Sequence, residues 1–145
     1  MPDSAFDSNV LLYLVSVNDQ RAARARDLVA DGGTISVQAL NEVVNVGRRK
    51  FKMPWPDLDA LLDELKDLLS LVPVDLETHE TACRLARRYK IAFYDAAIVA
   101  AALLADCDTL WCTCIAEPGS PAIGLAMKVA YMSCFNAASR RVRLK

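Results

Sequence analysis

Hydrophobic residues in this chain follow helical spacing over long stretches that are separated by short β-prone runs. The clearest stripe lies in residues 58–69, where Leu occupies positions 58, 61, 62, 65, 68 and 69. This spacing predicts an amphipathic helix with one apolar face. Residues 95–105 are apolar almost all round, which indicates a buried helix. We predict the remaining helices at residues 10–15, 20–30, 39–49 and 76–89.

Short apolar segments alternate with these helices. We predict strands at residues 5–7, 34–37, 71–74 and 109–111. Short apolar strands separated by helices favour an α/β fold in which a parallel sheet carries helices on both faces. Sites in such sheets form beyond the carboxyl ends of the strands. The residues that follow each strand are therefore the first place to look for chemistry.

Three acids occupy such positions. Asp7 closes the first strand, Glu42 lies one and a half turns into the helix after the second strand, and Asp95 opens the buried helix before the last strand. Carboxylates that converge at one sheet edge repel each other unless a cation lies among them. Oxygen ligands suit Mg²⁺ or Mn²⁺. Such an ion can lower the pKa of a bound water and stabilise charge on a phosphodiester.

Each acid also has a simpler explanation. Asp7 and Asp95 can each be the N-cap of the helix that follows. On a helical wheel Glu42 falls on the polar side of its helix, so that the wheel alone predicts an exposed side chain. The core face of that helix is predicted to consist of Val37, Leu40, Val43 and Val44.

The composition describes one globular domain without an overall basic character. The chain has 145 residues, of which 54% are hydrophobic and 24% charged, and its net charge is −1. A domain of this size buries about 70% of its unfolded surface and can fold without disulfide or metal cross-links. Nucleic-acid binding would require a local patch. Basic clusters that we interpret first as solvated helix faces are Arg21/Arg24/Arg26, Arg48/Arg49/Lys50/Lys52, Arg84/Arg87/Arg88/Lys90 and Arg140/Arg141/Arg143/Lys145.

No segment reaches the roughly 20 apolar residues of a membrane span. The apolar run 10–17 is preceded by Asp3 and Asp7 and by no Lys or Arg, which makes it a poor signal peptide. We therefore expect a cytoplasmic protein, without membrane association, whose cysteines are reduced. The single histidine, His79, is expected to face solvent.

Three segments together resemble the PIN-domain ribonucleases, in particular the VapC toxins of toxin–antitoxin pairs. They are FDSNVLLYL at 6–14, ISVQALNEVVNV at 35–46 and YDAAIVAAALLADCDTLW at 94–111. The resemblance implies a PIN-like fold, an endoribonuclease dependent on Mg²⁺ or Mn²⁺, an RNA substrate and a cognate VapB-like antitoxin. We also expect a homodimer.

The resemblance further implies that Asp7, Glu42 and Asp95 are the metal-binding and catalytic acids. Asn9 and Ser36 fall inside the matching segments and are expected to support the site.

The family pattern breaks after Trp111. The family typically places a fourth acid shortly after the last strand, at a position that Cys114 occupies here, and the nearest acid downstream is Glu117. A thiol is a poor replacement for a carboxylate on Mg²⁺. We therefore divide the chain into a PIN-like domain at 1–111 and a divergent segment at 112–145. That segment is either translated through a shifted frame or a divergent C-terminal helix over 125–136.

Three functions remain open from the sequence. The first is the ribonuclease toxin. The second is a catalytically impaired binding module that dimerises and sequesters the antitoxin. The third is a metal protein with Cys112, Cys114 and Cys134 as ligands, although the five cysteines do not have the spacing of a paired zinc site.

Overall fold

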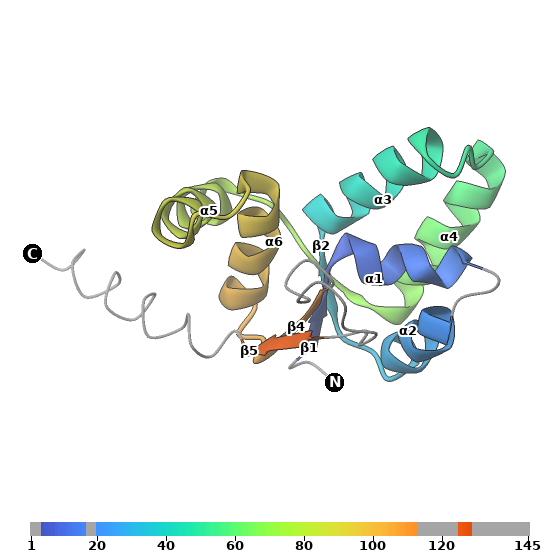
Figure 1. Ribbon diagram of the computed structural model, residues 1–145, viewed down its shortest axis with the longest axis horizontal. Coiled ribbons are helices and arrows are strands. Elements are labelled where there is room, and N and C mark those ends of the chain that lie inside the picture. The colour runs from blue at the N-terminus through green and yellow to red at the C-terminus, as the bar shows by residue number, and fades with distance from the viewer. Residues whose placement is uncertain (1–3, 17–19, 113–124, 129–145) are drawn as a thin grey trace, which may run out of the picture.

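The chain folds around a five-stranded sheet in the computed structural model, which describes residues 4–16, 20–112 and 125–128 (Figure 1). The strands lie in the order β3-β2-β1-β4-β5. The first four pair in parallel and β5 pairs antiparallel to β4. Their bounds are β1 (Ser4–Phe6), β2 (Thr34–Ser36), β3 (Ser70–Val72), β4 (Thr109–Cys112) and β5 (Leu125–Lys128). The predicted α/β fold with a parallel sheet is confirmed.

Within the described residues, six α-helices and one 3-10 turn connect the strands. Their bounds are α1 (Ser8–Leu12), the turn η1 (Tyr13–Val15), α2 (Gln20–Ala30), α3 (Val37–Arg49), α4 (Trp55–Leu68), α5 (Leu76–Tyr89) and α6 (Phe93–Leu104). In Figure 1, α5 and α6 lie to the left of the central strands, and α1 to α4 lie to their right. Helices thus cover the sheet from both sides, as the alternation of strands and helices predicts.

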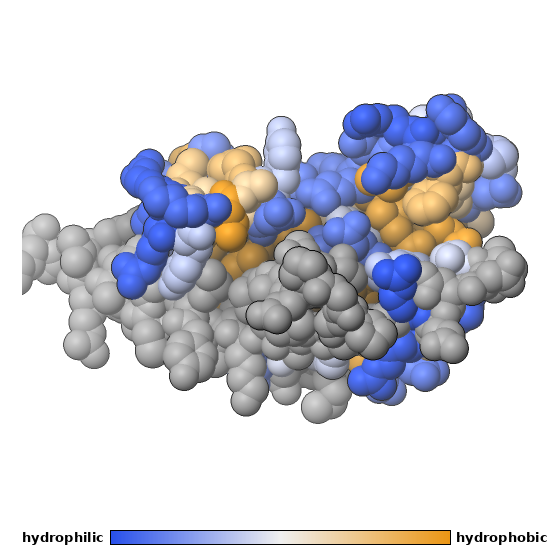
Figure 2. All heavy atoms as spheres, viewed as in Figure 1, coloured by the Kyte–Doolittle hydropathy of each residue, from blue (hydrophilic) through white to orange (hydrophobic). Residues whose placement is uncertain are grey.

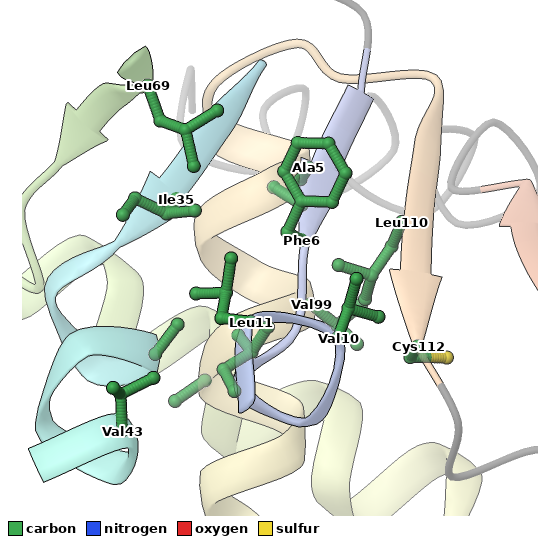
Figure 3. Close-up of a cluster of buried hydrophobic side chains, with 14 of the residues drawn as sticks. Ala5, Phe6, Val10, Leu11, Ile35, Val43, Leu69, Val99, Leu110 and Cys112 are labelled. Atoms are coloured by element: carbon green, nitrogen blue, oxygen red, sulfur yellow. The ribbon is translucent and has the colours of Figure 1, made fainter. Parts of the chain in front are cut away.

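The core forms where β1, β2 and β4 meet α1, α3 and α6 (Figure 3). Phe6, Leu11, Ile35 and Leu110 are among its largest fully buried side chains. Gly33 permits this close packing because a Cβ at that position would lie 2.6 Å from the Phe6 ring and 2.8 Å from the Ser4 carbonyl oxygen. Its φ of +151° is also a conformation that other residues rarely adopt.

Helix α4 begins three residues earlier than predicted. Pro54 is its N-cap and Pro56 lies in its first turn. Proline is tolerated there because the first N–H groups of a helix have no partner inside the helix. The two prolines therefore mark the start of the helix.

The core face of α3 agrees with the predicted one at Val43, which is fully buried, and at Leu40 and Val44, which are partly buried against the core. The fully buried positions also include Ala39 and Gly47, whereas Val37 is 39% exposed. Val37 lies two residues before Ala39, or about 200° around the helix, so the two side chains point in nearly opposite directions. The prediction that Val37 faces the core is wrong.

The segment after β4 returns to the sheet. Leu125–Lys128 pairs with β4, with Leu125 opposite Cys112 and Lys128 opposite Thr109. This pairing satisfies backbone groups of β4 that would otherwise form an open sheet edge. The helix predicted over 125–136 is therefore wrong for 125–128, and the rest of that range lies outside the described residues.

Candidate active site at the carboxyl edge of the sheet

Asp7 lies where β1 passes into α1. Its backbone N–H donates to the Trp111 carbonyl at 2.9 Å, which fixes this end of β1 against β4. Its own carbonyl accepts from the N–H groups of Val10 and Leu11, so that Asp7 is the N-cap residue of α1. Its side chain makes no capping hydrogen bond, however, and is only 4% exposed. The backbone thus occupies the predicted cap position while the carboxylate points to other partners.

Ser8 joins two of the candidate acids. Its Oγ lies 2.6 Å from Glu42 Oε2 and 3.2 Å from Asp7 Oδ1. A hydroxyl carries one proton and therefore donates to one carboxylate at a time. The shorter distance favours donation to Glu42. Ser8 is buried, and sequence reasoning did not single it out, although a serine directly after a candidate acid at the start of an apolar helix was a usable signal.

Glu42 comes from the second turn of α3 and is half-buried. Gln38, one turn earlier, donates from Nε2 to Glu42 Oε1 at 3.2 Å. The expectation that Glu42 is exposed is wrong because the start of α1 packs beside this part of α3 and brings Ser8 to the carboxylate. A helical wheel contains no information about a neighbouring helix.

The two supporting residues have different tasks. Asn9 Nδ2 donates to Asp7 Oδ2 at 3.3 Å and so contacts an acid directly. Ser36 is the N-cap of α3, where its Oγ accepts from the N–H of Ala39 at 3.1 Å. Its hydroxyl therefore holds the start of the helix that carries Glu42.

Asp95 approaches from the other side, in the first turn of α6. Helix α6 begins at Phe93 and its N-cap is Ala92, so the prediction that Asp95 is an N-cap is wrong. Asp95 is half-buried. Burial raises the pKa of its carboxyl, and the negative charge of Glu42 raises it further. Asp95 therefore lies within electrostatic reach of Glu42.

The pKa of Asp7 is raised for the same two reasons. Burial is the larger cause and the charge of Glu42 is the second, while hydrogen bonds from Ser8 and Asn9 oppose the shift. The charge of Glu42 thus raises the pKa of both aspartates, although the three acids are distant from one another in sequence. This crowding of negative charge is what a bound cation relieves.

The donor chemistry of these acids suits a hard divalent cation. All three are carboxylates, which fit Mg²⁺ or Mn²⁺ better than softer metals. Within residues 4–16, 20–112 and 125–128, no three His, Cys, Asp or Glu side chains lie together as a group that could hold a metal ion. Asp7 and Glu42 share the Ser8 hydroxyl, and the charge of Glu42 reaches Asp95, so these three are the carboxylates that would hold an ion at this edge of the sheet.

Of the three cysteines that the sequence offers as metal ligands, the structure describes only Cys112. Cys112 ends β4 with its side chain buried in the core (Figure 3). Cys114, Glu117 and Cys134 lie outside the described residues.

In the part of the chain that the structure describes, no helix is long and apolar enough to cross a bilayer.

Comparison with protein families identifies this architecture. The family model of the PIN domain matches residues 5–112, which contain all three acids. A search of curated proteins gave no significant match.

Solved structures of the same fold come from toxin–antitoxin systems. A toxin–antitoxin complex from Klebsiella pneumoniae has 24% identity and a TM-score of 0.59, over 81% of this chain and 92% of that one. VapC20 of Mycobacterium tuberculosis, described as a toxin that cleaves the sarcin–ricin loop, has 18% identity and a TM-score of 0.60, over 74% and 86%. DNA-bound VapBC from Salmonella typhimurium has 16% identity and a TM-score of 0.56, over 74% and 83%.

These similarities confirm the resemblance that the three sequence segments indicated. The chain belongs to the PIN-domain family.

Proposed function

We propose that this protein is a metal-dependent endoribonuclease and the toxin component of a toxin–antitoxin pair. The observation that carries the proposal is the contact of the Ser8 hydroxyl with both Asp7 and Glu42 at the carboxyl edge of a PIN-domain sheet, with Asp95 near enough for the Glu42 charge to raise its pKa. Three carboxylates from separate parts of the chain gain little by crowding together unless they serve a cation. Metal binding, RNA hydrolysis and toxicity are the proposed consequences.

Each residue has a defined task in this proposal. Asp7, Glu42 and Asp95 hold Mg²⁺ or Mn²⁺ through deprotonated carboxylates. When bound, such an ion supplies charge stabilisation and an activated water for phosphodiester hydrolysis. The Ser8 hydroxyl orients Glu42, and the Asn9 amide orients Asp7.

The partners in this proposal are an RNA substrate, a VapB-like antitoxin and a second copy of the chain, in the cytoplasm. Support for the antitoxin comes from the structural neighbours, several of which are toxin–antitoxin complexes. The neighbour described as cleaving the sarcin–ricin loop supports a structured RNA as substrate.

The direct test is cleavage of structured RNA by the purified protein. We expect hydrolysis that requires Mg²⁺ or Mn²⁺, stops with chelator and is lost in Asp7→Asn. Asp106→Asn is the matched control, because Asp106 is exposed and its φ of +56° is one that Asn tolerates. Equal cleavage by the parent and Asp7→Asn would refute the assignment of the site.

A second candidate is a PIN-domain binding module that dimerises and sequesters antitoxin with little or no cleavage. It is favoured by the absence of a closed group of metal ligands among the described residues. Tight antitoxin binding with no RNA cleavage at any Mg²⁺ or Mn²⁺ concentration would select this candidate. Cleavage that depends on Asp7 would exclude it.

A further inference from the structure

Exposed aromatic side chains directly precede Asp95 of the candidate active site in the first turn of α6. Phe93 and Tyr94 immediately precede Asp95, and they are 38% and 63% exposed. The Phe93 ring packs against Tyr94 at a centroid distance of 5.7 Å and against the His79 ring of α5 at 5.4 Å. We call His79, Phe93 and Tyr94 the aromatic platform.

The exposure of this platform contrasts with the rest of α6. Residues 96–103 are all buried. A tyrosine that is nearly two-thirds exposed contributes little to the core, because hydrophobic stabilisation scales with the area removed from water. Core packing therefore explains the later residues of α6 but not Tyr94. Its ring is available to a ligand within one residue of an acid in the candidate site.

Positive charge lies at the end of α5, a few residues before Phe93 and Tyr94 in the sequence. Arg87 and Arg88 occupy the last turn of α5 and Lys90 follows them, all exposed. The Arg88 guanidinium lies over the Tyr89 ring, 5.7 Å from its centroid. Figure 2 shows strongly hydrophilic side chains alongside a hydrophobic patch over α5 and α6 on this face. Cations beside exposed rings are the combination that binds single-stranded nucleic acid, through phosphates and stacked bases.

We propose that the aromatic platform holds an unpaired RNA base by stacking on Tyr94, and so places the adjoining phosphate at the three carboxylates. The proposal rests on the function proposed above, because it supplies that site with its substrate preference. A paired base in a helix is already stacked on its neighbours, whereas bases in loops and bulges can be splayed out onto aromatic side chains. The platform therefore selects RNA that is unpaired beside the scissile bond.

A second basic and aromatic cluster lies at the far end of α3 but fits this role less well. Arg48 donates to the Met53 carbonyl at 2.6 Å and lies over the Trp55 ring at 4.9 Å, so both groups close the turn between α3 and α4. Phe51 is 51% exposed there, nine residues beyond Glu42. Glu42 lies seven residues, or roughly 10 Å of helix axis, before the end of α3 at Arg49, and Phe51 lies beyond that end. Phe51 therefore provides a matched control.

The test measures binding of a synthetic RNA hairpin with an unpaired loop, in chelator and in an Asp7→Asn background, so that no cleavage occurs. A set of the same hairpins carries an abasic nucleotide at each loop position in turn. We expect Tyr94→Ala to weaken hairpin binding by about 5- to 140-fold, the range for loss of one stacked base. Tyr94→Trp should restore binding, and Phe51→Ala should change it by less than about 2-fold.

The abasic series identifies the stacked base. In the protein that keeps Tyr94, one abasic position should weaken hairpin binding by the same factor as Tyr94→Ala does. In the Tyr94→Ala variant, the same abasic position should cause no further loss of affinity. The proposal is overturned if Tyr94→Ala binds the hairpin like its parent, if it loses affinity equally for a fully paired duplex, or if no abasic position couples to it.

These outcomes are separable from those of the proposed function. Wild-type cleavage that needs Mg²⁺ or Mn²⁺, together with unaltered binding by Tyr94→Ala, contradicts the platform alone. Hairpin binding that couples to Tyr94 in a protein that never cleaves RNA contradicts the ribonuclease and keeps the platform.

Discussion

The Ser8 hydroxyl lies 2.6 Å from Glu42 Oε2 and links the start of α1 to the second turn of α3 across 34 residues of sequence. The same oxygen lies 3.2 Å from Asp7 Oδ1. One hydroxyl therefore lies between two acids whose negative charges repel each other. Without a cation, this hydroxyl and the amides of Asn9 and Gln38 offset the repulsion between the two carboxylates.

Ser8→Ala should destabilise the metal-free protein more than the metal-loaded protein. Loss of the hydroxyl removes the donor to Glu42, and a hydrogen bond to a charged group contributes about 1.5 to 3 kcal/mol. A cation would replace that donor. Urea unfolding in chelator and in Mg²⁺ measures both free energies.

Ser36→Ala is the control for Ser8→Ala, since it removes a helix cap that contacts neither acid. Its cost, about 1 kcal/mol, should be the same with and without metal. A Ser8→Ala cost that does not depend on metal would show that Ser8 has only a packing role.

The metal-free protein should become more stable as the pH falls from 7 toward 4. The ordinary pKa of these carboxyls is 3.8, and the folded state raises it for Asp7 and for Asp95. Between the ordinary and the raised pKa the folded protein holds protons that the unfolded chain has released. The free energy of unfolding therefore falls as the pH rises through this interval and stays low above the raised pKa.

Urea unfolding of the parent and of Asp7→Asn in chelator checks this pH dependence. The difference between the two proteins should be largest near pH 7, with Asp7→Asn the more stable, and should shrink on acidification. Mg²⁺ should reverse the trend, because the ion binds deprotonated carboxylates. A difference that is constant with pH would mean that Asp7 does not titrate abnormally.

Asp95→Asn should not destabilise the metal-free protein near pH 7. Burial and the Glu42 charge raise the pKa of Asp95 even though the α6 dipole favours the anion by about 0.3 to 1 kcal/mol, so removing the charge removes a net unfavourable interaction. Asp75→Ala is a useful contrast, because Asp75 is a true N-cap that accepts from Thr78 N–H. Thermal melts in chelator should show a larger decrease in Tm for Asp75→Ala than for Asp95→Asn. A larger decrease for Asp95→Asn would mean that Asp95 does cap its helix.

Cys114→Asp should increase RNA cleavage without altering antitoxin affinity. The backbone contact from Asp7 N–H to the Trp111 carbonyl shows that β4 ends beside Asp7, and in the sequence Cys114 comes two residues after the described end of that strand. An added carboxylate there would strengthen a weak metal position. If the parent is already fully active and the variant gains nothing, three acids suffice or Glu117 has the fourth role. Glu117→Gln separates those two cases.

The sequence predicts features that depend on local pattern. The apolar run of α6 indicates a buried helix, and the alternation of strands with helices indicates the parallel sheet. Asp7 is found because it follows a strand directly. Each of these inferences uses neighbours in the chain alone.

Features that depend on tertiary partners are not predicted. The burial of Glu42 comes from α1, whose Ser8 is distant in sequence, and the wheel of α3 contains no trace of it. Strand β5 forms because the edge of β4 is open to pairing, which the residues 125–128 do not reveal by themselves. The start of α6 at Phe93 makes Asp95 a residue of the first turn and leaves the cap position to Ala92.

The measurement that tests the central claim most directly is Mn²⁺ binding, followed by calorimetry or by electron paramagnetic resonance, in four single variants. If Asp7, Glu42 and Asp95 share one cation, then Asp7→Asn, Glu42→Gln and Asp95→Asn should each abolish or severely weaken binding at the same site, while Asp106→Asn binds like the parent. Unchanged Mn²⁺ affinity in any of the three site variants would contradict the shared metal site.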